Sequence, residues 1–363
     1  MSFNSNLNEA IGTVPGTMTR SGLQATRSGK PEILADTFDP ADAPALAAAS
    51  AALARLDDRL AGSAPAMVEG WRARAFIHEA AASARLNGDF ADADELRLAD
   101  AGALDRPPDP ELGQALLVLQ MIRSAGRRHP RQMFTPLRLI SLTRLRLNRS
   151  DPGSSDNAQR YHRLPVWLQD RLSEPGEIRA SLGKALDPVA VERWKTEAPL
   201  MAAADIIHRW HDARAAERVG AAAGRVLASA WPARSGATNG LVLMPSVGFL
   251  GHASEYRPDR GRRWTGAFLR ASLRSAEWGL RLHTDLVLVR RRLLESAGGR
   301  RATSRLPALI DRLVAVPSLS AAQAAVTLGM TDRASRSLLE DLHAGGMIRE
   351  VSGRGSFRVY AVA

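Results

Sequence analysis

The sequence predicts a mainly α-helical protein whose chain ends in a winged helix-turn-helix. Most of the 363 residues fall in alanine- and leucine-rich segments of helical period, which glycine and proline separate. Residues 303–363 follow a different order: helix, helix, turn, helix, strand, tight turn, strand. The chain has no cysteine. This excludes a disulfide scaffold, thiolate metal sites and a cysteine nucleophile.

The first 300 residues divide into a tail and a helical domain. Residues 1–40 are rich in Ser, Thr, Asn, Gly and Pro, and they predict a disordered tail. Residues 41–300 predict one helical domain of unknown function, with Trp71, Phe76 and Ile77 in its core. We expect its helices over 42–60, 67–84, 91–103, 112–122, 165–182, 188–211, 213–231 and 264–295, the last as one long basic helix or a pair. Prolines 107, 108 and 110 are expected to close the first unit, 150–160 to be a linker and 298–301 a hinge.

The C-terminal unit, 303–363, has capping and turn signals in the positions that a helix-turn-helix needs. Leucines and isoleucine at helical spacing predict a first helix over 306–313. Ser320 is a natural N-cap for a helix over 321–328, and Thr331 for the next helix. Ala325 and Gly329 supply the small residue and the turn glycine between them. Strands are expected over 347–351 and 356–362, with the tight turn at 352–355.

This arrangement predicts a DNA-binding unit. The helix after Thr331 would place its first turns at base edges in the major groove, while a basic wing meets phosphates. Arginine suits bidentate contact with guanine. The predicted contact residues are Thr331, Asp332, Arg333, Ser335 and Arg336 on the helix, and Arg349, Arg354 and Arg358 on the strands and wing. The expected partner is double-stranded DNA, bound by a homodimer on a two-fold site. Winged helices also serve as dimerisation or protein-interaction modules.

Net charge agrees with a polyanionic partner but does not locate it. The chain has 49 Lys+Arg against 38 Asp+Glu, a formal charge of +11. All but three of these bases are arginine, a choice that genome base composition could also explain. Residues 121–150 hold 8 bases and no acid, residues 251–302 hold 12 bases and 5 acids, and residues 303–363 hold only 7 bases and 5 acids. Nonspecific attraction is therefore expected from the helices before the C-terminal unit.

The sequence predicts a soluble, cytoplasmic protein without metal or cofactor. The longest uncharged apolar run, 241–250, is far shorter than the ~20 residues that span a bilayer, and no signal peptide is recognisable. His208 and His211 lack a third ligand, and the acids at 89–95 lack the spacing of a calcium loop. His252, Glu255 and Tyr256 are close in sequence without being expected to converge. Arg290–Arg292 and Arg300–Arg301 are either a solvated basic face or additional phosphate contacts, and we favour the second.

Three segments resemble Fic proteins. The C-terminal unit, ending in TLGMTDRASRSLLEDLHAGGMIREVSGRGSFRVYAV, is similar to the winged helix that follows many Fic domains. HEAAASARLNGDF resembles the segment in which Ser-x-x-x-Glu-Gly inhibits nucleotide transfer, although Asn87 stands here for the glutamate. The stretch from Leu241 to Leu293 resembles the helices after the catalytic motif. The arrangement is most similar to uncharacterised bacterial proteins with a domain of unknown function before a helix-turn-helix.

The catalytic motif of that family is not intact. The resemblance places His-x-Phe-x-Asp/Glu-Gly-Asn-x-Arg-x-x-Arg at 211–222, where only His211 matches. Alanine or valine stands at the phenylalanine, metal-acid, glycine and both arginine positions. Without the glycine backbone and fixed cations, phosphate cradling fails. We therefore predict that the protein is not an enzyme.

The function predicted from sequence is transcriptional regulation. The C-terminal winged helix would bind DNA, and the degenerate Fic-like domain would act as a dimerisation or sensing scaffold. Two alternatives stay open. One is a divergent Fic-type nucleotidyl (AMP) transferase that uses His211, and the other is the protein-interaction module of a toxin–antitoxin pair. The operator and any small-molecule effector are unknown.

Overall fold

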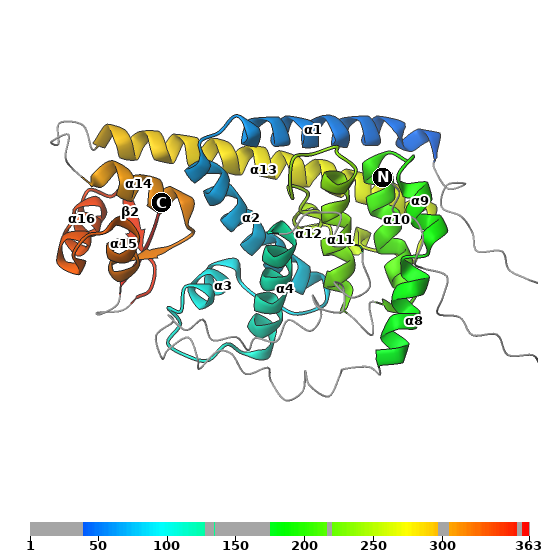
Figure 1. Cartoon of the computed structure of the whole chain (residues 1–363), viewed down its shortest axis with the longest axis horizontal. Coiled ribbons are helices and arrows are strands. Elements are labelled where there is room, and N and C mark those ends of the chain that lie inside the picture. Colours follow the sequence, from blue (N-terminus) through cyan, green and yellow to red (C-terminus); the bar gives the residue numbers. More distant parts are fainter. Residues whose placement is uncertain are drawn as a thin grey trace, which may run out of the picture.

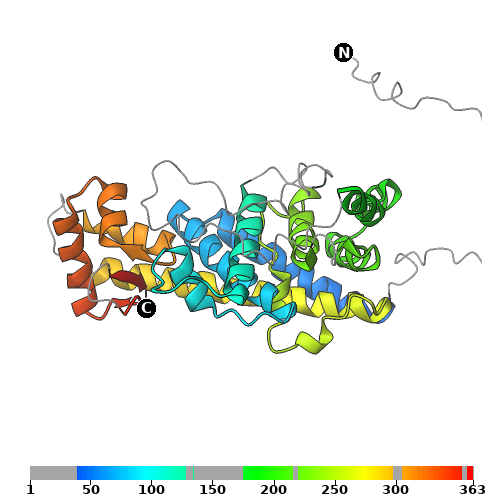
Figure 2. The same cartoon turned by 90° about the horizontal axis from the view of Figure 1, so that it is seen from below.

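The computed structural model describes residues 39–127, 134, 175–215, 220–296, 305–353 and 358–362. The described part is mainly helical. A long helix, α13, runs beside α1 along one side, and α8 to α10 lie at one end of the molecule (Figure 1). Residues 305–353 and 358–362 form the opposite end, as the view from below also shows (Figure 2). None of the described helices combines the length and apolar character needed to cross a bilayer.

The described helices before residue 300 correspond to predicted ones, with three changes, except for the short helix α12, which the sequence did not predict. Residues 165–174 of the predicted helix 165–182 lie outside the described residues. Their bounds are α1 (Ala43–Ala61), α2 (Pro65–Leu86), α3 (Ala93–Asp100), α4 (Pro110–Gly126), α8 (Pro175–Ala185), α9 (Pro188–Trp194), α10 (Pro199–Asp212), α11 (Ala221–Arg234), α12 (Pro245–Gly248) and α13 (Arg262–Ser296). The predicted tail up to residue 38, the linker 150–160 and the hinge 298–301 lie outside the described residues.

Proline and positive φ angles account for the three changes. The helix predicted over 188–211 is two helices, because Ala198 before Pro199 is extended, with a ψ of 131°. Within the helix predicted over 213–231, α11 begins at Ala221, and Arg214 and Gly220 before it have positive φ angles of 54° and 97°. Pro110 begins α4 instead of closing a unit, since proline is favoured at the first helical position.

The core between α1, α2 and α13 is closely packed. Trp71, Phe76 and Ile77 are buried, as predicted. The indole nitrogen of Trp71 donates to the carbonyl oxygen of Gly279, 2.8 Å away. A methyl group on Gly279 would lie 2.7 Å from a side-chain carbon of Leu56, so glycine is what lets α1 lie so near α13.

The C-terminal unit consists of three helices and a small sheet. Its elements are α14 (Leu306–Ala315), β1 (Leu319–Ser320), α15 (Ala321–Leu328), α16 (Asp332–Ala344), β2 (Ile348–Glu350) and β3 (Val359–Val362). The strands form an antiparallel sheet in the order β1-β3-β2, with Leu319 opposite Tyr360 and Ile348 opposite Val362. The sequence did not predict β1, which has only two residues.

Candidate nucleic-acid interface

The turn between α15 and α16 is built by local capping. Ser320 Oγ accepts from the backbone N–H of Gln323 (3.2 Å), and Gln323 Oε1 accepts from the N–H of Ser320 (3.0 Å), which completes a capping box. Gly329 ends α15 with a φ of 60°, a left-handed conformation that favours glycine. Thr331 Oγ1 then accepts from the N–H of Ala334 (3.2 Å) and starts α16. The predicted caps are confirmed.

The first turn of α16 is open to solvent. Thr331, Asp332, Arg333 and Arg336 are exposed. Arg336 donates to Asp332 across one helical turn (2.6 Å). Arg333 has no hydrogen-bond or ion-pair partner within the described part of the chain. Arg333 is thus free to contact a ligand, whereas Arg336 would have to give up its ion pair with Asp332 to do so.

Ser335 does not belong to this open face. Its side chain is 0 % exposed, and its Oγ donates to the carbonyl oxygen of Thr331 (3.1 Å). Ser335 lies two residues from Arg333, on the side of the helix that bears the buried Leu339 and Leu342. Ser335 was predicted as a contact residue because it is close in sequence to the exposed residues of α16. Its burial removes it from the candidate contact residues.

The strands present two of the three predicted arginines, Arg349 and Arg358, both exposed. Arg354 lies outside the described residues. The turn after β2 is organised by Glu350, whose Oε1 accepts from the backbone N–H groups of Ser352 (2.7 Å) and Gly353 (3.0 Å). Arg349 lies 3.8 Å from Asp94 of α3, so this strand arginine faces an acid of the preceding domain. Both side chains are largely exposed, and such a pair contributes only ~0–1 kcal/mol.

The exposed surface of α16 is not basic. Arg333 and Arg336 are countered by three exposed acids, Asp332, Glu340 and Asp341. Electrostatic attraction to a polyanion must therefore come from other parts of the chain.

Arg74, which the sequence did not single out, joins the C-terminal unit to α2. Its Nη1 donates to the carbonyl oxygens of Val314 (2.7 Å) and Gly70 (3.1 Å), and its Nη2 to those of Val316 (2.8 Å) and Leu313 (3.4 Å). A cation is favourable at the carbonyl end of a helix, here α14. Burial, and then the nearby Arg97, lower the pKa of Arg74 to about 10, so it remains charged at neutral pH. No local pattern marks this residue, because three of its four partners are some 240 positions away.

Ser83 and Asn87, which belong to a segment that resembles Fic proteins, are hydrogen-bonded to a second arginine. Arg225 of α11 is buried, and it donates from Nε to Ser83 Oγ (2.9 Å) and from Nη2 to Asn87 Oδ1 (2.9 Å). Its Nη1 donates to the hydroxyl of Tyr256 (3.0 Å). This contact joins α2 to α11 and the segment before α13. His211, by contrast, is exposed in the last turn of α10, and residues 216–219 of the compared motif lie outside the described residues.

The other candidate groups have structural partners. His208 Nδ1 lies 2.6 Å from the carbonyl oxygen of Pro258, and Asp92 caps α3. Glu255 lies near His252 (3.5 Å) and near Arg274 (3.4 Å). Among the described residues, no three acids or histidines are grouped as metal ligands would be.

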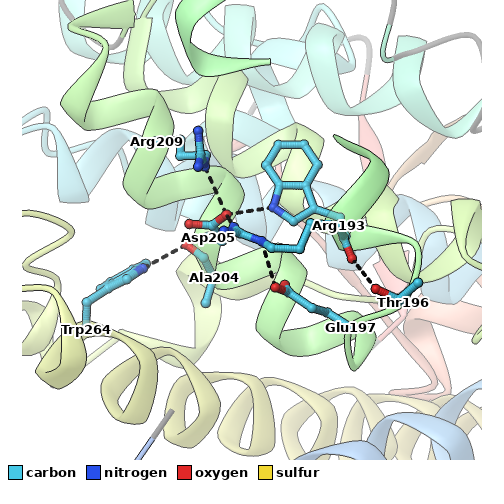
Figure 3. A network of polar contacts seen from close by, with 8 residues as sticks. Arg193, Thr196, Glu197, Ala204, Asp205, Arg209 and Trp264 are labelled. Atoms are coloured by element: carbon cyan, nitrogen blue, oxygen red, sulfur yellow. Dashed lines mark hydrogen bonds and ion pairs between the residues drawn. The ribbon is translucent and has the colours of Figure 1, made fainter. Parts of the chain in front are cut away.

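A charge cluster around the buried Asp205, at the far end of the molecule, ties α9 to α10 (Figure 3). Asp205 accepts from Trp194 Nε1 (2.7 Å), Arg209 Nε (3.1 Å) and Arg193. Arg193 also pairs with Glu197 (2.8 Å), and burial raises the pKa of that glutamate. Two acids face two bases, so we attribute a structural role to this cluster.

Comparison with known proteins agrees with the geometry of the C-terminal unit. Residues 306–362 match the family described as "HTH DNA binding domain". The chain therefore carries a helix-turn-helix DNA-binding domain at residues 306–362, within which α15, Gly329 and α16 are the helix, turn and helix.

One curated relative is similar over part of the chain. It is the uncharacterized protein y4cF of Sinorhizobium fredii, 32% identical over 141 residues. This similarity covers 38% of the chain and 36% of the relative, so the chain spans little more than a third of the relative's length. Neither comparison shows a Fic-like domain.

Proposed function

We propose that this protein is a transcriptional regulator that binds double-stranded DNA through residues 306–362 folded as a winged helix. The observation that carries the proposal is the open first turn of α16, with Arg333 and Arg336 exposed, inside a unit that matches a DNA-binding family. The order of the three helices and the antiparallel pairing of β1, β3 and β2 support a winged helix. Arg349 and Arg358 on or beside the strands are suited to phosphate contacts.

In this proposal Arg333 reads a base and Arg336 is recruited from Asp332. Arg333 has no described partner to give up, so it can approach a guanine edge without losing an ion pair. Arg336 would give up its surface ion pair with Asp332, which contributes little to stability, and contact a phosphate or a base instead. Arg349 would likewise give up its pair with Asp94 and contact a phosphate.

The domain before the helix-turn-helix is proposed to have a Fic-like fold and to act as a dimerisation or sensing scaffold. Arg225 joins Ser83 and Asn87 to Tyr256, residues of two segments that resemble Fic proteins. A homodimer would present two helix-turn-helix units to a two-fold DNA site. We assign no catalytic role to His211 and no metal or cofactor to the scaffold.

The proposal is tested by selection of genomic DNA fragments with the full-length protein, including the region upstream of its own coding sequence. Selected fragments are then compared with unselected ones in gel-shift titrations. We expect Arg333→Ala combined with Arg336→Ala to lower affinity by about tenfold or more and to remove the preference. Arg55→Ala, which removes one exposed arginine of α1, is the control and should leave the preference unchanged. Unchanged binding by the double variant would contradict the assignment of α16.

A further inference from the structure

The cavity with the most direct connection to the helix-turn-helix lies between it and the preceding domain. Its volume is about 800 Å³, within the ~300–1,000 Å³ of small-molecule sites. One wall comes from α2 and the ends of α1, α3 and α4. The other wall is Ala315–Ser318, the connection from α14 to β1, together with Gln323 of α15. Such seams between domains are where ligand sites are commonly found.

The charges that line this cavity do not cancel. Asp100 accepts two hydrogen bonds from Arg123 (2.5 and 2.6 Å), and Glu69 pairs with Arg312 (3.3 Å). Both lining acids are thus already matched. Arg72 and Arg127 also line the cavity, and neither has an acidic partner among the residues that the structure describes.

The remaining wall is apolar. Leu60, Val68, Phe76, Val316 and Pro317 all line the cavity. Two lining arginines without acidic partners, together with apolar lining residues, suit an organic anion, because arginine binds carboxylate and phosphate groups through paired, charge-assisted hydrogen bonds. A neutral apolar molecule would leave both cations without a partner.

We propose that this cavity binds a small organic anion, with a carboxylate or phosphate group at Arg72 and Arg127 and an apolar body against Phe76 and Val316. Such a ligand would touch both the domain of α2 and the segment that leads into β1 and the capping box of α15. Ser318 and Gln323, which line the cavity, flank Ser320, the N-cap of α15. The ligand is therefore placed to change how the helix-turn-helix is held.

The effect on DNA rests on the proposed function, whereas the binding site does not. If the ligand binds the DNA-competent arrangement more tightly, it raises DNA affinity, and DNA raises ligand affinity by the same factor. Ligand binding is therefore measured first on the full-length protein without DNA, so that its failure is distinguishable from a failure to bind DNA.

The test uses saturation-transfer NMR titrations with phenyl phosphate, benzoate, inorganic phosphate and benzyl alcohol. We expect saturable binding of phenyl phosphate or benzoate, tighter than that of inorganic phosphate or the neutral alcohol. The tighter of the two organic anions identifies the head group. Arg72→Met and Arg127→Ala should each weaken binding by about tenfold. Arg55→Ala, outside the cavity, should not change it.

The proposal would be overturned by three outcomes. These are no saturable binding of either organic anion, equal binding of benzyl alcohol, or wild-type affinity in both cavity variants. Circular dichroism melts establish that the variants are folded, and the exposed Arg127 provides a variant that disturbs no described packing. Where DNA binding is also found, its affinity with and without the saturating anion measures the coupling.

Discussion

Among single residues, Arg333 and Arg336 of α16 lie three positions apart but differ in their ion-pair partners. Both are exposed, yet only Arg336 is held by an acid. The sequence predicts the shared face, because residues three apart lie on one side of a helix. It predicts neither the ion pair nor the burial of Ser335, which depend on side-chain rotamers and on the packing of Leu339.

Asp332 is expected to restrain DNA binding. Asp332→Asn releases Arg336 and removes one negative charge at the proposed interface, so DNA affinity should rise by about threefold to tenfold at low salt. Glu340→Gln removes the same charge farther along α16 without touching Arg336, and its effect should be smaller. Fluorescence anisotropy titrations of the two variants compare them directly. An equal gain in both variants would show that the Asp332–Arg336 pair is irrelevant.

Glu79 makes stability depend on pH. Burial raises its pKa to about 7, although the N–H groups of Ser246 and Val247 donate to its carboxylate (3.1 and 3.0 Å). A group whose pKa is higher in the folded than in the unfolded state holds its proton more tightly when folded. Its contribution to stability is therefore present below pH ~4.5 and is lost as the pH rises toward 7.

Glu79→Gln should remove this dependence. Between pH 5 and pH 8 the wild-type protein is expected to lose about 2–3 kcal/mol of unfolding free energy relative to the variant. Urea denaturation at both pH values measures the difference. A constant difference between variant and wild type across this range would refute the buried, titrating carboxyl.

At the scale of elements, the contact between α2 and α14 depends on glycine. A methyl group on Gly70 would lie 2.1 Å from the carbonyl oxygen of Val314, so Gly70→Ala must push the two helices apart. We expect a loss of about 2–4 kcal/mol of unfolding free energy. Gly113→Ala in α4 is the matched control, because nothing lies within 4 Å of the added methyl group.

Gly113→Ala should instead stabilise the protein by ~0.5–1 kcal/mol, because alanine favours a helix interior. Opposite signs in urea denaturation are therefore the expected pattern. A stabilising Gly70→Ala would show that α14 is not seated on α2 in solution.

Elements with strong local signals were predicted from sequence, and those set by distant contacts were not. Ser320, Gly329 and Thr331 specify both ends of α15 and the start of α16 by hydrogen bonds to residues at most five positions away. β1 exists only because Leu319 and Ser320 pair with β3 some forty residues later. The contacts of Arg74 with the carbonyl groups of Leu313, Val314 and Val316 are likewise invisible in sequence, since they join positions about 240 apart.

At the scale of the whole molecule, the helix-turn-helix is continuous with the preceding core. Arg74, Gly70 and the pairs Arg290–Asp311 (2.9 Å) and Arg312–Glu69 (3.3 Å) all cross from α14 to the domain before it. These contacts tie the position of α14 to that of the preceding domain. This arrangement gives a ligand in the adjoining cavity a physical route to the DNA-binding surface.

The proposal also predicts the absence of nucleotidyl transfer. Full-length protein incubated with labelled ATP and cell lysate should give no label transfer that depends on His211, because the phosphate-binding glycine and arginines of the motif are replaced. His211→Ala and wild type should be indistinguishable by autoradiography. If the wild-type protein transfers label and His211→Ala does not, the enzymatic alternative is favoured.

The central claim is that α16 reads DNA sequence, and its most direct test is the ratio of affinities for a selected and a scrambled site. Anisotropy titrations at fixed salt give this ratio for the wild-type protein and for Arg333→Ala. We predict that the variant loses about 1–3 kcal/mol on the selected site and little on the scrambled one, so that the ratio falls. An equal loss on both sites, or an unchanged ratio, would contradict base reading by α16.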